Sequence, residues 1–410
     1  MAEIKAFLCI KPTKDMAAQV AALPYDVYNR EEATREVQGK PYTFLRIDRA
    51  ETQFDESIDT YADCVYEKAK ELLCEMIDKG VYVKENKKCY YIYELTMNGR
   101  VQTGIVACAA IDDYLNNVIK KHENTRADKE LDRIRHVDTC SAQTGPIFLA
   151  YRKNDTINEI IAKTKKTEPI FDFVSEDGIK HVGYIIDNEN DIDVIEKEFS
   201  LIDNIYIADG HHRAASAVKV GLKRRDENPG YDVHSEFNYF LSVLFQEQEL
   251  MIMPYNRVVK DLNGMTKEDF ISNIENFFSV EKVTEKFEPA KKGQIAMYLE
   301  EEWYKLEAKD EILSKDAVEG LDVSLLQNYV LGKYLNIEDP RTDKRIDFIG
   351  GIRGIGELER RCGLDMKVAF AMYPTSIQEL FEVADAGKLM PPKSTWFEPK
   401  LRSGLFIHEI

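Results

Sequence analysis

The sequence predicts a mixed α/β protein of the α+β class. Runs with strand-like spacing alternate with runs of helical spacing along most of the 410 residues. An Asn98-Gly99 pair separates two apolar segments, 89–97 and 101–111, and predicts a β-hairpin between them. Strands that alternate with helices, together with a local hairpin, are typical of mixed folds rather than of purely helical or purely β folds.

The expected elements follow one another without an internal repeat or a low-complexity linker. Residues 57–79 carry an apolar stripe at helical spacing, to which Val65, Leu72 and Met76 belong. Gly80 then marks the end of that helix. Further strands are expected at 3–10, 43–48, 146–152, 182–187, 204–208, 237–246 and 250–259, as a pair near 278–308, and at 345–349, 366–373 and 404–409. Further helices are expected at 126–138, 266–277, 321–335 and 375–386, with one more beginning near His211.

The chain is longer than one ordinary hydrophobic core supports, so we expect two parts. The pattern changes after the segment 254–257 (PYNR), which places the expected boundary near residue 260. We predict that residues 1–260 hold a nucleotide- or phosphate-binding region. Residues 261–410 are expected to form a C-terminal α/β region that packs against it.

Composition excludes several classes of partner. A formal net charge of −18 repels nucleic acid and anionic membranes, so neither is an expected partner. No apolar run has the length of a membrane span, and the N-terminus lacks the pattern of a signal peptide. The seven cysteines are scattered without a Cys-x-x-Cys pair, which favours reduced thiols over disulfides or a zinc site. We therefore expect a cytoplasmic protein.

The segment 204–217 (NIYIADGHHRAASA) carries the strongest functional signal. A short apolar strand runs into a turn at Asp209 and Gly210, and a helix begins near His211. This arrangement directs free backbone N–H groups and the positive end of a helix dipole into one space, where an anion such as phosphate binds. Gly210 lets the backbone approach the anion, and Arg213 adds a planar cation suited to phosphate oxygens. The alternative is an ordinary helix N-cap followed by two surface histidines.

A basic stretch is the second signal. If 126–138 is helical, Arg126, Lys129 and Arg133 recur at intervals of three or four and share a face. This stripe either lines a phosphate site, with the segment 120–123 (KKHE) at its mouth, or is a solvated face laced with ion pairs. In the first case, Arg126 or Lys129 should point toward the turn of the first signal, because clustered cations on an acidic protein attract an anionic ligand.

Two further segments are candidates for the edge of a site. Residues 23–27 (LPYDV) form a rigid junction that is either a turn or a site edge. Residues 390–404 form a long, chemically rich loop, or alternatively a surface loop packed by its aromatic side chains. The loop residues suited to phosphates are Lys393, Ser394, Thr395, Lys400 and Arg402. The sequence contains no P-loop, G-x-G-x-x-G, G-x-S-x-G or H-E-x-x-H motif.

Taken together, these segments resemble the bacterial and archaeal family known as domain of unknown function 1015, over nearly the whole length. The segments that carry the resemblance are 23–27 (LPYDV), 120–126 (KKHENTR), 129–133 (KELDR), 143–146 (QTGP), 208–213 (ADGHHR) and 390–395 (MPPKST). The DGHHR element also resembles the phosphate motif of the ParB/sulfiredoxin-like fold. This resemblance implies a ParB/sulfiredoxin-like core with extensive insertions.

Particular residues indicate which group of proteins with that fold this chain resembles most. Sulfiredoxins place a reactive cysteine where this chain has His211, so reduction of sulfur acids is not expected. ParB proteins carry an Arg-rich box and a DNA-binding helix-turn-helix, and neither is recognisable here. Free-serine kinases carry an aspartate beside the glycine of the motif, which Asp209 matches. Their catalytic glutamate lies in an N-terminal segment, for which Glu123 and Asp26 are both candidates.

The resemblance and the motifs predict a nucleotide-dependent phosphotransferase that acts on a small hydroxyl metabolite such as free serine, with ATP or ADP and Mg²⁺. Such transfer needs cations and N–H donors around the phosphoryl oxygens and a group that accepts the hydroxyl proton. Asp209 or Glu123 would be the base or hold Mg²⁺. The residues expected to bind phosphate or nucleotide are Gly210, His211, His212, Arg213, Arg126, Lys129 and Arg133, and the expected site edge comprises Asp26, His122, Lys393, Ser394 and Thr395. The alternative function is a non-catalytic sensor of a nucleotide or phosphometabolite.

Overall fold

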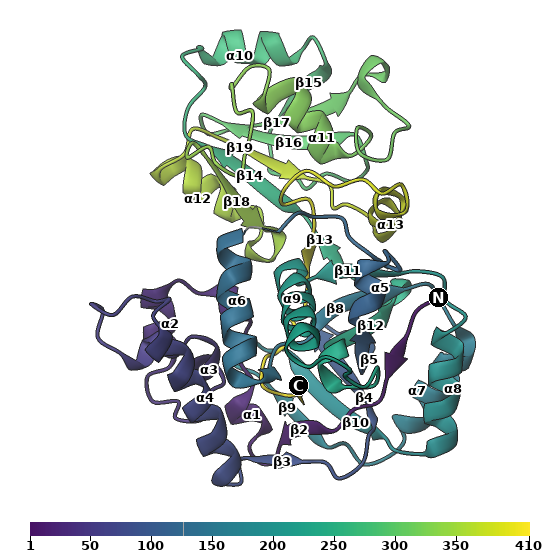
Figure 1. Ribbon diagram of the computed structural model, residues 1–410. Coiled ribbons are helices and arrows are strands. Elements are labelled where there is room, and N and C mark those ends of the chain that lie inside the picture. The colour runs from purple at the N-terminus through teal and green to yellow at the C-terminus, as the bar shows by residue number, and fades with distance from the viewer. Residues whose placement is uncertain (126) are drawn as a thin grey trace. The chain divides into compact units, whose positions relative to one another are not determined.

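The computed structural model describes residues 1–125 and 127–410, which form the mixed α+β structure that the sequence predicts (Figure 1). Contacts between residues divide the chain into two compact units. The first unit comprises Met1–Leu250 and Pro399–Ile410, and the second comprises Met251–Glu398. The chain therefore passes from the first unit to the second near residue 250 and returns to the first near residue 398. The assignment of separate roles to 1–260 and 261–410 stays a prediction.

The first unit is built on a large sheet. Its strands are β1 (Ile4–Lys5), β4 (Tyr90–Met97), β5 (Arg100–Ala110), β6 (Ile119–Lys120), β8 (Ile147–Tyr151), β9 (Phe171–Val174), β10 (Lys180–Ile186), β11 (Ile205–Asp209) and β12 (Tyr239–Gln246). Across the described residues the order is β6-β11-β8-β12-β5-β4-β10-β9, with β1 also paired to β5. The pairs β6–β11 and β8–β12 are parallel. The predicted β4–β5 hairpin is confirmed, and its turn residues Asn98 and Gly99 both have positive φ, 52° and 78°.

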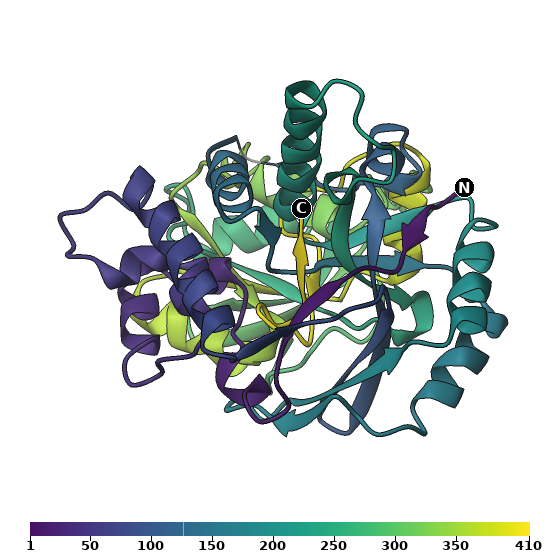
Figure 2. The same cartoon turned by 60° about the horizontal axis from the view of Figure 1, so that its bottom comes forward.

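A smaller sheet joins the two ends of the chain within the first unit. It orders β3 (Tyr82–Lys84), β2 (Cys9–Pro12), β21 (Ile407–Glu409) and β7 (Ala142–Gln143). Figure 2 shows the yellow C-terminal strand β21 near the purple strand β2, with which it pairs antiparallel. This pairing draws the segment after Pro399 back onto the first unit.

Nine helices accompany these sheets in the described residues of the first unit. They are α1 (Ala17–Val20), α2 (Arg30–Glu36), α3 (Leu45–Asp48), α4 (Asp63–Asp78), α5 (Ile111–Leu115), α6 (Ala127–Cys140), α7 (Asp155–Thr164), α8 (Glu189–Phe199) and α9 (His211–Glu227). Short 3-10 turns lie at Tyr25–Val27, Ala50–Gln53, Glu236–Asn238 and Glu247–Glu249. Helices α6 and α9 lie side by side, and the Ser216 hydroxyl of α9 donates a 3.0 Å hydrogen bond to the Glu130 carbonyl of α6 (Figure 1).

Two apolar cores hold the first unit together. One lies between the large sheet and its helices, where the small side chains Ala214 and Ala217 let α9 approach the sheet closely. The other collects the apolar stripe of α4, including Val65, Leu72 and Met76, with Phe44 and Ile407. The predicted stripe of the segment 57–79 is therefore confirmed, although the helix begins only at Asp63.

The expected strand at 43–48 is wrong, because the chain forms helix α3 there. Phe44, Leu45, Ile47 and Asp48 are all buried. Intervals of one, three and four place these four side chains on one side of a helical turn, whereas a strand would send neighbours to opposite faces.

The second unit contains its own sheet of six strands among the described residues, in the order β15-β17-β16-β19-β14-β18. They are β14 (Tyr255–Val259), β15 (Phe278–Val283), β16 (Gln294–Leu299), β17 (Glu302–Ala308), β18 (Ile346–Gly350) and β19 (Val368–Met372), and β13 (Ile252–Met253) pairs separately with β20 (Trp396–Phe397). The helices are α10 (Lys267–Ile274), α11 (Asp322–Leu326), α12 (Gly356–Leu364) and α13 (Ile377–Asp385), with a π-helical turn at Gln327–Leu331 and 3-10 turns at Asp310–Ile312 and Gly351–Arg353. Pro254 divides the strand expected at 250–259, because proline lacks the N–H that a ladder requires. The pair expected near 278–308 is a group of three strands. None of the described helices combines the length and the apolar character that a membrane span requires.

Candidate functional site

The turn between β11 and α9 is the centre of the site. Gly210 connects the two elements with φ 93° and ψ 32°, a left-handed conformation that glycine adopts readily. A Cβ placed at Gly210 would lie 3.0 Å from Nε of Arg213, so the guanidinium group lies directly against this backbone. Helix α9 has 17 residues, no acidic residue in its first turn and no side-chain cap. Its first N–H groups and its dipole therefore favour an anion at this position.

Two cations hold the carboxylate that precedes the turn. Oδ2 of Asp209 lies 3.5 Å from Nζ of Lys400 and 3.4 Å from Nη2 of Arg213. Loss of hydration raises the pKa of Asp209, but the charges of Lys400 and Arg213 outweigh it, and the pKa lies below its ordinary value. Asp209 is therefore an ionised carboxylate and a weak base. Arg213 also donates from Nη1 to the carbonyl oxygen of Pro146, and this hydrogen bond helps to fix the position of the guanidinium group.

Two buried histidines, His122 and His211, lie next to this turn. The His122 and His211 side chains are almost fully buried, and their rings meet edge to face with centroids 4.5 Å apart. Burial lowers the pKa of His122 to about 4 and places that of His211 well below its ordinary value, so both rings are neutral near neutral pH. The His122 backbone N–H donates to Nε2 of His211 over 3.4 Å. The neutral ring of His211 therefore carries its proton on Nδ1, which lies 3.9 Å from Oε2 of Glu123.

The two carboxylates proposed from the sequence as catalytic groups occupy different places. Glu123 has a half-exposed side chain beside His211 at the start of α9. Asp26 is exposed on the 3-10 turn Tyr25–Val27, at the wall of a separate cavity. The structure thus brings Glu123 close to the motif around Gly210, whereas Asp26 accompanies the residues of α6. His212 is partly buried within the first turn of α9, and its phosphate-binding role stays a prediction.

The basic stripe is not a uniform solvated face. Arg126 lies outside the described residues. The Arg133 guanidinium is buried: its Nε and Nη2 lie 3.0 Å and 2.9 Å from Oδ2 of Asp132, and it stacks over the Tyr25 ring at 4.0 Å. Lys129, one turn earlier, lines a cavity of about 340 Å³ together with Arg133.

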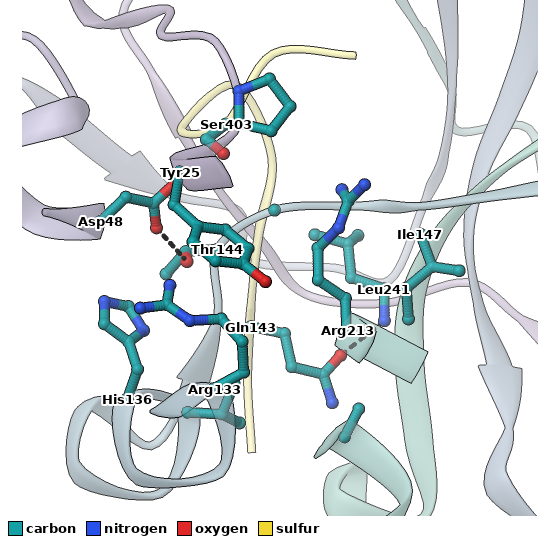
Figure 3. Close-up of a pocket in the computed structure, with 14 residues that line it drawn as sticks. Tyr25, Asp48, Arg133, His136, Gln143, Thr144, Ile147, Arg213, Leu241 and Ser403 are labelled. Carbon is teal, nitrogen blue, oxygen red and sulfur yellow. Dashed lines mark hydrogen bonds between the residues drawn. The ribbon is translucent and has the colours of Figure 1, made fainter. Parts of the chain in front are cut away.

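Helices α6 and α9 both line a smaller cavity of about 30 Å³ (Figure 3). Arg133 of α6 and Arg213 of α9 both line it, so cations more than 70 residues apart in the sequence face one space. Of these two cavities, Lys129 lines the larger and not the smaller. Four residues line both cavities: Tyr25, Asp48, Arg133 and His136.

Sequence reasoning missed several residues of these walls, namely Tyr25, Asp48, Gln143, Thr144 and Ser403. A signal existed for some of them, because the segments 23–27 and 143–146 stood out as motifs. Asp48 offered no such signal, since it belongs to the segment that the pattern assigned to a strand.

The loop after residue 390 divides between the two units. Lys393, Ser394 and Thr395 belong to the second unit, where the Ser394 hydroxyl donates to the Pro391 carbonyl at 2.6 Å and Lys393 lies 5.6 Å from the Tyr255 ring centroid. Their role at a site edge stays a prediction. Lys400, from the same loop, belongs to the first unit and contacts Asp209 as described above.

Replacing Gly210 with alanine is expected to destabilise the protein and to weaken anion binding. The left-handed conformation costs a residue with a Cβ about 1–2 kcal/mol, and here the new methyl group must also displace the Arg213 guanidinium. Urea unfolding and calorimetric titration with phosphate measure the two effects. The matched control is Gly230→Ala, which has φ 84° and open space around its Cβ position. Equal losses in both variants would show that Arg213 moves aside without cost.

Several solved structures are similar to this chain at low sequence identity. Among solved structures, it is similar to a variant of a free serine kinase in complex with AMP, at 15% identity and a TM-score of 0.37, over 73% of this chain and 92% of that chain. It is also similar to SbnI with a C-terminal truncation from Staphylococcus aureus, at 13% identity and a TM-score of 0.40, over 73% and 87%. A conserved hypothetical protein from Pyrococcus furiosus shares 17% identity with a TM-score of 0.35, over 74% and 94%.

No curated protein matches this chain. The model of one family, described as a protein of unknown function (DUF1015), matches residues 4–324, which is more than half of the sequence. The chain therefore belongs to the DUF1015 family.

Proposed function

We propose that this protein transfers a phosphoryl group from a nucleotide, ATP or ADP, to a small hydroxyl metabolite such as free serine. The observation that carries the proposal is the turn at Gly210. It joins an uncapped helix start, the Arg213 guanidinium and the Lys400 ammonium around one space, with the Glu123 carboxylate nearby. Phosphoryl transfer depends chiefly on such positioned charges, and it also needs a group that accepts the hydroxyl proton.

Each group has its own role in the proposed reaction. The first N–H groups of α9 and the Arg213 guanidinium bind the phosphate oxygens. The acceptor hydroxyl oxygen attacks the terminal phosphorus, the bond to the leaving phosphate oxygen breaks, and the hydroxyl proton passes to Glu123. Asp209 is unsuited to that last role because its depressed pKa makes it a weak base. Asp209 instead holds Lys400 and Arg213 in place.

Mg²⁺ would accompany the nucleotide. Among the described residues, no group of three or more potential ligand side chains could hold a metal ion. Mg²⁺ at nucleotide sites needs fewer protein ligands, because it binds one or two carboxylates and completes its coordination shell with phosphate and water oxygens. Asp209 fits that smaller donor set, and the bound ion would neutralise charge on the phosphate oxygens.

A non-catalytic nucleotide or phosphometabolite sensor is the second candidate function. One observation favours it: Lys400 and Arg213 hold the pKa of Asp209 below its ordinary value, so this carboxylate of the motif is a weak base. A sensor needs the anion site but not a positioned base.

One experiment separates the two functions. Purified protein is incubated with ATP or ADP, Mg²⁺ and a panel of hydroxyl compounds, and phosphorylated products are sought by mass spectrometry. The melting temperature is measured with and without each nucleotide. A product supports the phosphotransferase, a nucleotide-dependent rise in melting temperature without product supports the sensor, and the absence of both contradicts both functions.

The Arg213→Ala variant is expected to bind nucleotide more weakly by about 1.5–3 kcal/mol, the usual contribution of a hydrogen bond to a charged group. Isothermal titration calorimetry with ATP or ADP measures this loss. The control is Arg35→Ala, which removes an exposed arginine from a surface ion pair with Glu31. Unchanged affinity in Arg213→Ala would assign this arginine a structural role, in which it holds the Pro146 carbonyl and the Asp209 carboxylate.

A further inference from the structure

The larger cavity beside the site is a candidate binding site of its own. We call it the α6 cavity, and it is bounded by Tyr25, Asp48, Tyr66, Lys129 and Arg133, among others. Its volume of about 340 Å³ lies in the range of small-molecule pockets. It shares walls with the smaller cavity that Arg213 lines. A ligand in the α6 cavity would therefore sit next to the proposed phosphate site.

A buried carboxylate faces this cavity without a direct ion pair. Asp48 is 5% exposed, and the one hydrogen bond to its carboxylate among the described residues comes from the Thr144 hydroxyl at 3.3 Å. None of the described lysines or arginines forms an ion pair with it. Figure 3 draws the smaller cavity and shows the Asp48 carboxylate joined to Thr144 at the wall of that cavity. The Arg133 charge acts on Asp48 from beyond ion-pair distance. A buried carboxylate whose direct partner is a neutral hydroxyl favours a cationic ligand group at this position.

Donor groups face the same space without acceptors. Arg133 uses Nε and Nη2 on Asp132, and no described group accepts a hydrogen bond from its Nη1. The Tyr25 side chain is 7% exposed, and its hydroxyl likewise has no hydrogen-bond partner in the described part of the chain. Figure 3 shows the Tyr25 ring and the Arg133 guanidinium on one side of the smaller cavity. An arginine and a tyrosine hydroxyl together suit a carboxylate.

We infer that the α6 cavity binds a small zwitterion, with its ammonium at Asp48 and its carboxylate at Arg133 and the Tyr25 hydroxyl. A ligand with only one of these charges would leave the other buried group without a partner, and that loss is the basis of selection. The inference rests on the proposed function in one respect: the bound zwitterion is the phosphoryl acceptor. Its side-chain hydroxyl extends from the shared wall toward Arg213.

Calorimetry with four probes tests the inference without any turnover. L-Serine and L-alanine carry both charges, ethanolamine lacks the carboxylate, and glycolate lacks the ammonium. Both amino acids are expected to bind at least about tenfold more tightly than either singly charged probe. Each group that a probe lacks leaves a buried protein group without its ligand partner. Equal binding of all four probes, or no binding of either amino acid, overturns the inference.

Two variants identify the residues involved. Asp48→Asn and Tyr25→Phe are each expected to weaken L-alanine binding about tenfold, while ATP affinity stays unchanged because the Gly210 turn is untouched. The matched control is Thr60→Val, a neutral change in the wall of the same cavity. Melting temperatures identify a variant that fails to fold. If L-alanine binding is the same in Asp48→Asn and the native protein, the cavity is not the zwitterion site.

L-Alanine also separates this inference from the proposed phosphotransfer, because it has no hydroxyl to phosphorylate. Binding of L-alanine that depends on Asp48, without any phosphorylated product from the hydroxyl panel, supports the zwitterion site and contradicts the phosphotransferase. A phosphorylated amino acid formed equally well by Asp48→Asn supports the phosphotransferase and overturns the zwitterion site.

Discussion

Replacing Glu123 with glutamine is expected to slow phosphoryl transfer by about 10²–10⁴-fold, the usual contribution of a general acid or base. In the proposed reaction Glu123, beside the start of α9, is the base, because Lys400 and Arg213 depress the pKa of Asp209. Glutamine preserves the shape of the side chain but does not accept the proton. The measurement is kcat with the best acceptor of the panel, accompanied by the nucleotide Kd, which should not change.

The control for this variant is Glu31→Gln, an exposed glutamate whose partner is Arg35 on the surface of α2. It is expected to keep the full rate. A Glu123→Gln protein that also keeps the full rate would assign the proton transfer to another group. A fall in nucleotide affinity with unchanged kcat would instead place Glu123 in Mg²⁺ or nucleotide binding.

The Arg133→Met variant is expected to lose about 3–5 kcal/mol of the free energy of unfolding, because it leaves the buried Asp132 carboxylate without its cation. The side chains of Arg133 and Asp132 are only 8% and 10% exposed. The methionine retains much of the stem that packs against Tyr25 but none of the charge. Urea unfolding monitored by circular dichroism measures the loss.

A neighbouring arginine on α6 provides the comparison. Arg135 pairs with the exposed Asp63, and Arg135→Met is expected to cost below about 1 kcal/mol. Adding Asp132→Asn to Arg133→Met should restore part of the stability by removing the uncompensated charge. If Arg133→Met is no more destabilising than Arg135→Met, solvent reaches Asp132 and the pair contributes little.

The sequence by itself determined the features that depend on neighbouring residues. The hairpin at Asn98 and Gly99 follows from two residues that tolerate positive φ between apolar strands. The strand, turn and helix around Gly210 follow from an apolar run, a glycine and a helix-forming segment. Helices α7 and α8 were predictable in principle, because each begins at an asparagine whose side chain caps the helix.

Only the tertiary structure decided which residues complete the site. Lys400 contacts Asp209 across 191 positions because the pairing of β21 with β2 returns the end of the chain to the first unit. Asp48 faces a cavity because the segment that looked like a strand forms a helical turn with its apolar side in the core. Arg133 is buried rather than solvated because α6 packs beside α9 and Tyr25 covers its guanidinium. Backbone preferences act over a few residues, whereas the environment of a charge depends on which surfaces the whole fold brings together.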